Sequence, residues 1–210
     1  KVNSIIQTVK EKFAPDKRTA VFNLEATESK NKFTIKGETN IADAKLEFIG
    51  LMKESNLNFD DQIEMLPSEK LGEKKYGVIN LSVANIRSKP DHHEELATQS
   101  ILGTPIKILK KGEDGYYLVQ TPDNYIAWLD DDGFTFMTED QGKEWKSSPK
   151  IIYSKEYGFS YSEADVNSQT VSDLVAGNLL KIMGEDSDFY LVNYPDGRTA
   201  YVKKDEVKLF

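Results

Sequence analysis

One phrase of thirteen residues occurs twice in this sequence, and the repetition constrains the fold more than any other feature. Tyr116–Trp128 reads YYLVQTPDNYIAW, and Phe189–Tyr201 reads FYLVNYPDGRTAY, at an offset of 73 residues. Upstream, Leu102–Leu109 matches Ala176–Met183 at an offset of 74. A fixed period of this kind indicates that the same supersecondary unit is built twice along the chain.

Within each repeat, short runs of β-branched and aromatic residues are separated by turn residues. Ile106–Ile108 is one such run, and it predicts a strand. Pro122–Asn124 and Pro195–Gly197 suit tight hairpins, because Pro presets φ and Asn or Gly accepts a positive φ. Five short strands in about 60 residues, with one long loop after the first, are typical of a small closed or half-open barrel. We expect two such β-barrels, at residues 76–137 and 150–210.

The first 70 residues follow a different pattern. Ile5, Val9 and Phe13 repeat every four positions, which predicts an apolar helix face. A second helical stripe runs from Ile41 to Met52, and Asn40 with Asp43 resembles a cap at its start.

Strands complete this first block. Alternating apolar residues at 20–26 and 33–35 predict two strands, and 59–66 predicts a third. The order αββαβ predicts a small α+β domain at residues 1–70, with two helices on one face of a sheet. The expected fold class is therefore mainly β: this α+β domain and then the two barrels. Pro67–Lys75 is expected to be a polar, charged linker, and Thr138–Pro149 is expected to join the two barrels, with Trp145 packed between them.

Composition excludes several classes of partner. The net charge of −8 argues against nucleic acid, which requires a basic surface. No apolar run approaches the roughly 18 residues of a membrane span. The chain has no cysteine, so disulfides, thiolate zinc sites and cysteine nucleophiles are excluded. Because the chain begins at Lys1 without an initiator Met, we expect a mature or trimmed form whose signal segment was removed.

Two motifs invite a metal ion, and neither predicts one. His92 and His93 are adjacent, and successive residues of an extended segment point to opposite sides, so we expect a solvated loop. Trp128–Gly133 reads WLDDDG, which lacks the ligand spacing of a calcium loop. We therefore expect no metal and no cofactor.

The repeats resemble a known family. The phrases VANIRSKP, LATQSILGTPIKILKK, YYLVQTPDNYIAWLD and YGFSYSE are similar to the bacterial SH3-like domains paired in secreted NlpC-type cysteine endopeptidases. Those enzymes cut peptidoglycan stem peptides between D-glutamate and the diamino acid. The first 70 residues resemble, in topology, the BON-like modules of bacterial envelope proteins. The resemblance implies a location in the cell envelope, either periplasmic or secreted.

In that family a catalytic domain with a cysteine nucleophile follows the second barrel. This sequence ends at EVKLF, where that domain would begin, and it has no cysteine. The resemblance therefore implies no catalytic residue in this chain. We expect either a piece of a full-length NlpC-type peptidase with a C-terminal catalytic domain, or a stand-alone relative without one.

The resemblance also implies a ligand site on the first barrel. In the family, an acidic side chain near the start of the TQ strand and a tyrosine of the last hairpin hold the free α-amine of the stem peptide's L-Ala. Tyr125 matches the tyrosine, whereas Ala97 precedes Thr98 where the acid is expected. The nearest carboxylates belong to Glu94 and Glu95, and Trp128 lies nearby. A carboxylate and an aromatic face together suit an ammonium group.

The sequence thus predicts a non-catalytic region that targets a cell-wall endopeptidase and positions its stem-peptide substrate. Two alternatives stay open. One is a stand-alone envelope module that binds peptidoglycan or a protein partner. The other is a structural module whose barrels only pack on neighbouring domains.

Overall fold

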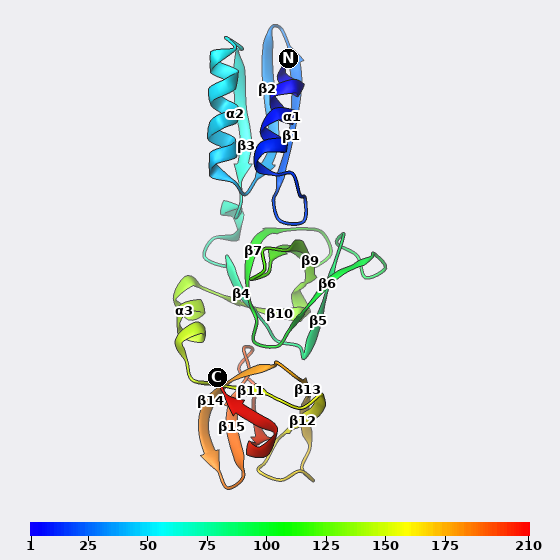
Figure 1. Cartoon of the computed structure of the whole chain (residues 1–210), viewed down its shortest axis with the longest axis vertical. Helices are drawn as coiled ribbons and strands as arrows, with labels where there is room; N and C mark the ends of the chain where they lie inside the picture. The colour runs from blue at the N-terminus through cyan, green and yellow to red at the C-terminus, as the bar shows by residue number, and fades with distance from the viewer. The chain divides into compact units, whose positions relative to one another are not determined.

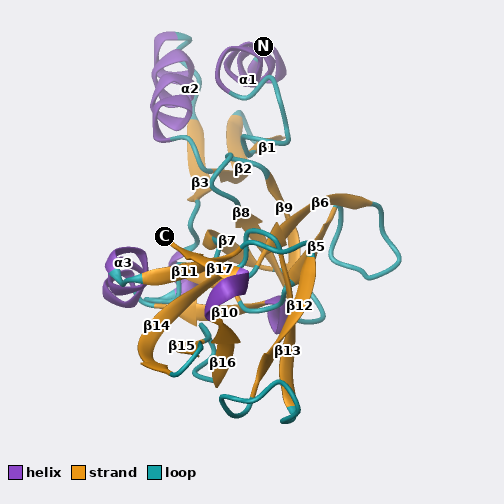
Figure 2. Cartoon of the chain, turned by 60° about the horizontal axis from the view of Figure 1, so that its bottom comes forward, coloured by secondary structure: helices purple, strands orange, loops and turns teal.

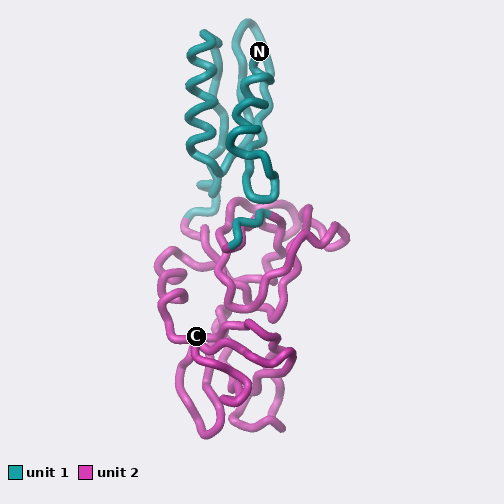
Figure 3. The backbone as a smooth tube through the Cα atoms, in the orientation of Figure 1, with its two compact units in different colours: residues 1–72, 123–126 teal, residues 73–122, 127–210 magenta.

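The computed structural model describes all 210 residues, which form two units (Figure 3). The first unit comprises residues 1–72 together with 123–126. The second comprises residues 73–122 and 127–210. The mainly β class with a small N-terminal α+β region, predicted from the sequence, is confirmed.

The first unit has the predicted element order αββαβ (Figure 1). The central strand of its sheet is β2, which pairs with β1 antiparallel and with β3 parallel. The helix α2 is therefore the crossover of a parallel βαβ unit. The β1–β2 turn places Lys30 and Asn31 at positive φ, as a tight hairpin requires. The elements are α1 (Val2–Phe13), β1 (Phe22–Ser29), β2 (Lys32–Thr39), α2 (Ala42–Glu54) and β3 (Phe59–Met65).

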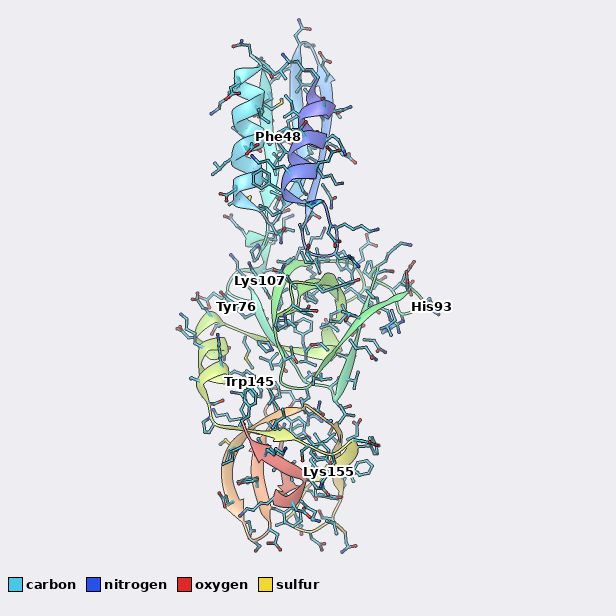
Figure 4. The ribbon with its side chains drawn as sticks, in the orientation of Figure 1. Phe48, Tyr76, His93, Lys107, Trp145 and Lys155 are labelled. Carbon is cyan, nitrogen blue, oxygen red and sulfur yellow. The ribbon has the colours of Figure 1, made fainter.

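The core of this unit lies between the helices and the sheet. Ala44, Phe48 and Met52 of α2 recur every four residues and are fully buried, as the predicted stripe requires (Figure 4). From α1, Val9 is fully buried beside them, and Ile35 of β2 closes the core.

The predicted cap of α2 is wrong. The helix begins at Ala42 after Ile41, and no side chain caps it. The Asn40 side chain instead accepts a 2.8 Å hydrogen bond from the backbone N–H of Val21. Asn40 therefore ties the start of β1 to the end of β2, because a strand end offered it an unpaired donor.

Most of the regular structure of the second unit is strand (Figure 2). Its first sheet has the order β10-β4-β7-β8-β9-β5-β6. Figure 4 shows Tyr76 and Lys107, which are directly opposite partners on β4 and β7. The strands are β4 (Tyr76–Ile79), β5 (Val83–Arg87), β6 (Leu96–Ile101), β7 (Pro105–Lys111), β8 (Tyr116–Gln120), β9 (Ile126–Asp130) and β10 (Phe134–Met137).

The second sheet has the order β13-β12-β16-β15-β14-β11-β17. Each of its strands is the counterpart of the strand seven numbers earlier in the first sheet, and the order of neighbours is the same when read from the other edge. In both sheets the pairing ends at the outer strands, so neither sheet closes into a barrel and the half-open form is observed. The strands are β11 (Lys150–Tyr153), β12 (Tyr157–Tyr161), β13 (Thr170–Val175), β14 (Leu179–Asp186), β15 (Phe189–Asn193), β16 (Thr199–Lys203) and β17 (Val207–Leu209).

Irregularities of pairing fall at equivalent places in the two sheets. The register of β7 shifts between Ile108 and Lys110, and that of β14 shifts between Ile182 and Gly184. A single pair joins β5 to β9, Arg87 with Trp128, and its counterpart joins β12 to β16. Bulges bend a strand and increase its twist, so each sheet is curled at the same position.

The segment predicted to join the two barrels contains a helix, α3 (Glu139–Ser147). Thr138 and Gln141 form a reciprocal capping box at its start. Trp145 is buried with Val78 and Met137, and its indole N–H donates to the carbonyl of Gly103 at 3.0 Å. The segment joins the two sheets, as predicted, but it does so as a helix that the tryptophan fixes to the first sheet.

The two sheets of the second unit contact each other directly. The Leu179 N–H donates to the Leu102 carbonyl at 3.0 Å, and Ser82 donates to Asp173 at 2.6 Å. The side chain of Leu102 is fully buried in the core of the second sheet. Polar and apolar contacts together therefore join the sheets into one unit.

Candidate functional site

Three of the four predicted ligand residues lie on one part of the first sheet. Glu94 and Glu95 belong to the loop between β5 and β6, and Trp128 belongs to β9. Strands β5 and β9 meet at the pair formed by Arg87 and Trp128. The pairing therefore places the backbone of Trp128 beside the strand that leads into the acidic loop.

The acidic loop is ordered by its own contacts. The Glu94 carboxylate accepts a 2.9 Å hydrogen bond from the Lys89 ammonium, which raises the pKa of Lys89. The Glu94 carbonyl accepts from the Arg87 guanidinium at 3.1 Å, and the Glu95 carbonyl accepts from the Ser88 N–H at 2.9 Å. These bonds hold the loop while the side chain of Glu95 is exposed.

The pair formed by Lys89 and Glu94 is largely in solvent, with 68% of the lysine side chain and 33% of the glutamate side chain exposed. Exposed ion pairs contribute about 0–1 kcal/mol to stability. An incoming ammonium group can therefore take the place of Lys89 at low cost.

The indole of Trp128 is half-buried, and a cation lies over it. The Lys110 ammonium is 5.5 Å from the ring centroid. Gly112 leaves room for the ring, since a Cβ there would lie 2.4 Å from the indole carbon Cζ3. The surroundings of Trp128 are thus suited to a cation and already hold one.

Tyr125 has different surroundings, because residues 123–126 belong to the first unit. The next residue, Ile126, donates its N–H to the Arg18 carbonyl at 2.6 Å. Asp16 raises the pKa of the Arg18 guanidinium through a hydrogen bond, and the charge of nearby Tyr125 adds a smaller effect in the same direction. The role of Tyr125 in amine binding stays a prediction.

The sequence reasoning missed a cluster formed by His92, Tyr116 and Asp130. The His92 Nε2 lies 3.3 Å from the Asp130 carboxylate, and its ring meets the edge of Tyr116 at 5.5 Å between centroids. Tyr116 is only 3% exposed, and its hydroxyl has no hydrogen-bond partner. Burial raises the pKa of Tyr116, and the charge of Asp130 raises it further.

The feature of the sequence that could have predicted this cluster is the length of the loop, not the pair of histidines. The loop folds back on the sheet, so His92 reaches Asp130, whereas His93 pairs with Asp91 at 2.9 Å and is almost fully exposed. Figure 4 shows His93 at the outer end of the loop. Adjacent histidines do point to different partners, as expected.

Asp130, Asp131 and Asp132 are the residues that come nearest to a set of metal ligands, with carboxylate oxygens within 4.8 Å of one another. Asp130 accepts the Asp132 N–H at 3.0 Å, as a cap of the short 3-10 turn that follows β9. Asp131 and Asp132 are exposed. This arrangement is that of a charged turn.

Comparisons with known proteins place part of the first sheet in a domain family. Residues 86–134, from β5 to the start of β10, match the family model described as the bacterial dipeptidyl-peptidase SH3 domain. No curated protein matches the chain. No helix of the chain has both the length and the apolar character needed to cross a membrane.

Two solved structures resemble the chain. An NlpC/P60 family protein from Bacillus cereus is 18% identical with a TM-score of 0.53, and the match covers 64% of this chain and 56% of that one. An NlpC/P60 endopeptidase from Photobacterium damselae subsp. piscicida is 14% identical with a TM-score of 0.47, covering 69% of this chain and 35% of that one. The chain thus spans little more than half of the first protein and about a third of the second. The first similarity shows a shared fold.

Proposed function

We propose that this chain is the non-catalytic region of a bacterial cell-wall endopeptidase, which targets the enzyme and positions peptidoglycan stem peptides. The observation that carries the proposal is the match of residues 86–134 to the SH3 domain of bacterial dipeptidyl-peptidases. The fold shared with an NlpC/P60 protein supports it. The location that follows is the cell envelope, periplasmic or secreted.

The second sheet is proposed to be another SH3-like domain, which makes the pair a tandem. Its strand order and bulge positions correspond to those of the first sheet. The first unit is proposed to be a BON-like module, on its αββαβ order alone.

Catalysis is assigned to a separate, C-terminal domain of the full-length protein. NlpC-type chemistry uses a cysteine thiolate as nucleophile, and this chain has no cysteine to supply one. The function proposed for these 210 residues is therefore binding rather than bond cleavage.

The bound group proposed for the first sheet is the free α-amine of the stem peptide's L-Ala. Glu95 offers an exposed carboxylate, and Glu94 offers one that is held only by a solvated lysine. Trp128 offers an aromatic face. A charge-assisted hydrogen bond and a cation–π contact would act together on the ammonium. Tyr125 is included as the predicted tyrosine of this site.

The test is a titration with the tripeptide L-Ala-γ-D-Glu-diamino acid, followed by NMR at the Trp128 indole and the Glu95 amide. We expect saturable shifts that disappear when the α-amine is acetylated. Glu95→Gln should weaken binding, and Tyr125→Phe tests the tyrosine. The control is Glu163→Gln, which changes an exposed carboxylate in the corresponding loop of the second sheet. Equal binding of the acetylated peptide would reject the amine site.

A pelleting assay with purified sacculi separates the alternatives. Pelleting by the chain alone, with no response to the tripeptide, would favour a stand-alone envelope module. If the chain neither pellets with sacculi nor responds to the tripeptide, a structural module is favoured. The targeting function is then rejected.

A further inference from the structure

A cavity of about 260 Å³ lies in the second unit, where α3 crosses between the two sheets. Its walls come from β10, α3, β14 and the turn after β15. Its lining combines one ion pair, Lys181 with Glu144, and buried aromatic rings. The residues that matter most are Met137, Glu144, Trp145, Lys181, Asn193 and Tyr194.

The floor of the cavity is apolar. Met137, Trp145 and Tyr194 are all at least nine-tenths buried. The indole N–H of Trp145 is used by the Gly103 carbonyl, and the hydroxyl of Tyr194 is paired with Ser160 at 2.7 Å. Both rings therefore offer only carbon surface to the cavity, which favours an apolar group in a ligand.

The cavity lining carries one lysine, Lys181, and one carboxylate, Glu144, and a second lysine lies next to Lys181. Lys150 and Lys181 are directly opposite partners on β11 and β14. The Lys150 ammonium is buried and donates to the carbonyls of Trp145, Lys146 and Ser148 at the end of α3. The Lys181 ammonium has the Glu144 carboxylate at 2.7 Å. Lys181 is therefore paired with one exposed carboxylate, whereas Lys150 is held by backbone carbonyls.

Glu144 is the replaceable member of this group. Its side chain is 69% exposed, whereas that of Lys181 is 27% exposed. A solvated ion pair is weak, so a second carboxylate that enters the cavity can share or take over Lys181. The carboxylate of a ligand at Lys181 would make a charge-assisted hydrogen bond.

Asn193 adds a hydrogen-bonding group to the lining of the cavity. Its amide nitrogen donates to the carbonyls of Gly197 and Arg198, at 3.2 and 3.1 Å. Asn193 lines the cavity, and its side-chain oxygen is a hydrogen-bond acceptor. A peptide N–H is a donor that fits it, at a short distance along the chain from a terminal carboxylate.

From these contacts we propose that the cavity binds the C-terminal carboxylate end of a short peptide whose last residue has a small apolar side chain. The carboxylate pairs with Lys181, the side chain rests on Trp145 and Tyr194, and the last peptide N–H donates to Asn193. This site goes beyond the proposed function and does not depend on it, since it involves other residues and the opposite end of a peptide.

The experiment is calorimetry with N-acetyl-alanyl-alanine as free acid and as C-terminal amide, on the whole chain. We expect saturable binding of the acid, and binding of the amide weaker by about tenfold or more. The substitution Lys181→Met should weaken binding of the free-acid peptide by a similar factor. Lys203→Met is the control, because this lysine is equally half-buried and pairs with Asp205 on the same sheet.

Glu144→Gln keeps the proposal testable if Lys181→Met fails to fold. Removal of the competing carboxylate should tighten binding of the acid and leave the amide unchanged. The proposal is overturned if acid and amide bind equally, if no saturable binding occurs at millimolar acid, or if a folded Lys181→Met protein binds the acid normally. None of these outcomes affects the amine titration, so the two proposals are tested independently of each other.

Discussion

The indole N–H of Trp145 donates to the carbonyl oxygen of Gly103, and this one bond joins α3 to the turn between β6 and β7. Gly103 has a φ of 86°, and a Cβ there would lie 2.6 Å from the Cβ of Leu179 in the second sheet. Leu179 in turn donates its N–H to the Leu102 carbonyl. The helix and both sheets therefore meet at a single glycine.

Replacement of Gly103 by alanine should destabilise the second unit by about 1–3 kcal/mol, from left-handed backbone strain and overpacking against Leu179. Urea unfolding followed by tryptophan fluorescence measures the loss. Gly197→Ala is the matched control: its φ is 90°, but no atom lies within 4 Å of the added Cβ. A loss for Gly103→Ala no larger than that of the control would contradict the packing role of Leu179.

Lys150→Met should destabilise the protein by about 1–3 kcal/mol, because three carbonyls at the end of α3 lose their common donor. The loss comes despite the relief of a buried charge, since burial lowers the pKa of Lys150 and nearby Lys181 lowers it further. Lys146→Met removes an exposed ammonium from the same helix and should be nearly neutral. Chemical denaturation of both variants checks the difference, and a stabilised Lys150→Met protein would refute the capping role.

Tyr116→Phe should leave stability unchanged or raise it by up to about 1 kcal/mol, because the hydroxyl it removes is buried without a partner. Tyr194→Phe provides the contrast: its hydroxyl is 2.7 Å from the Ser160 Oγ, and its loss should cost about 1 kcal/mol. Thermal denaturation of both variants measures whether each substitution raises or lowers stability. Equal losses would show that the Tyr116 hydroxyl has a bound partner in solution.

Asp16 should titrate with a pKa of about 2, lowered from 3.8 by hydrogen bonds from the side chain and backbone of Arg18. A carboxyl with a lowered pKa in the folded state contributes stability above its ordinary pKa. That contribution is lost as the pH falls from about 4 through about 2. NMR titration of the Asp16 carboxyl measures the midpoint. Arg18→Gln should return it toward 3.8, and a midpoint that does not move would exclude Arg18 as the cause.

Periodicity was sufficient for the first unit, because its helices bury one clear stripe each. Val9, Phe48 and Met52 are core residues at the predicted spacing. The cap at Asn40 was misread, since a side chain that can cap a helix can equally bond a strand N–H brought near by the fold. Local sequence does not distinguish these two partners.

The helix α3 could have been found from its capping box, Thr138 with Gln141, but not from apolar periodicity. It has one buried residue, Trp145, and the rest of its surface is charged or polar. The contact of His92 with Asp130 and the pairing of Lys150 with Lys181 depend on tertiary register. Sequence spacing alone does not supply that register.

Leu102 lies in the first sheet's sequence yet is fully buried in the second sheet's core. A gene fusion or domain swap that carried only the residues after α3 would leave a leucine-sized hole in the transplanted fold. Such holes cost about 2–5 kcal/mol, a large part of the stability of a small domain. A recombination boundary between the two sheets is therefore disfavoured by a single side chain.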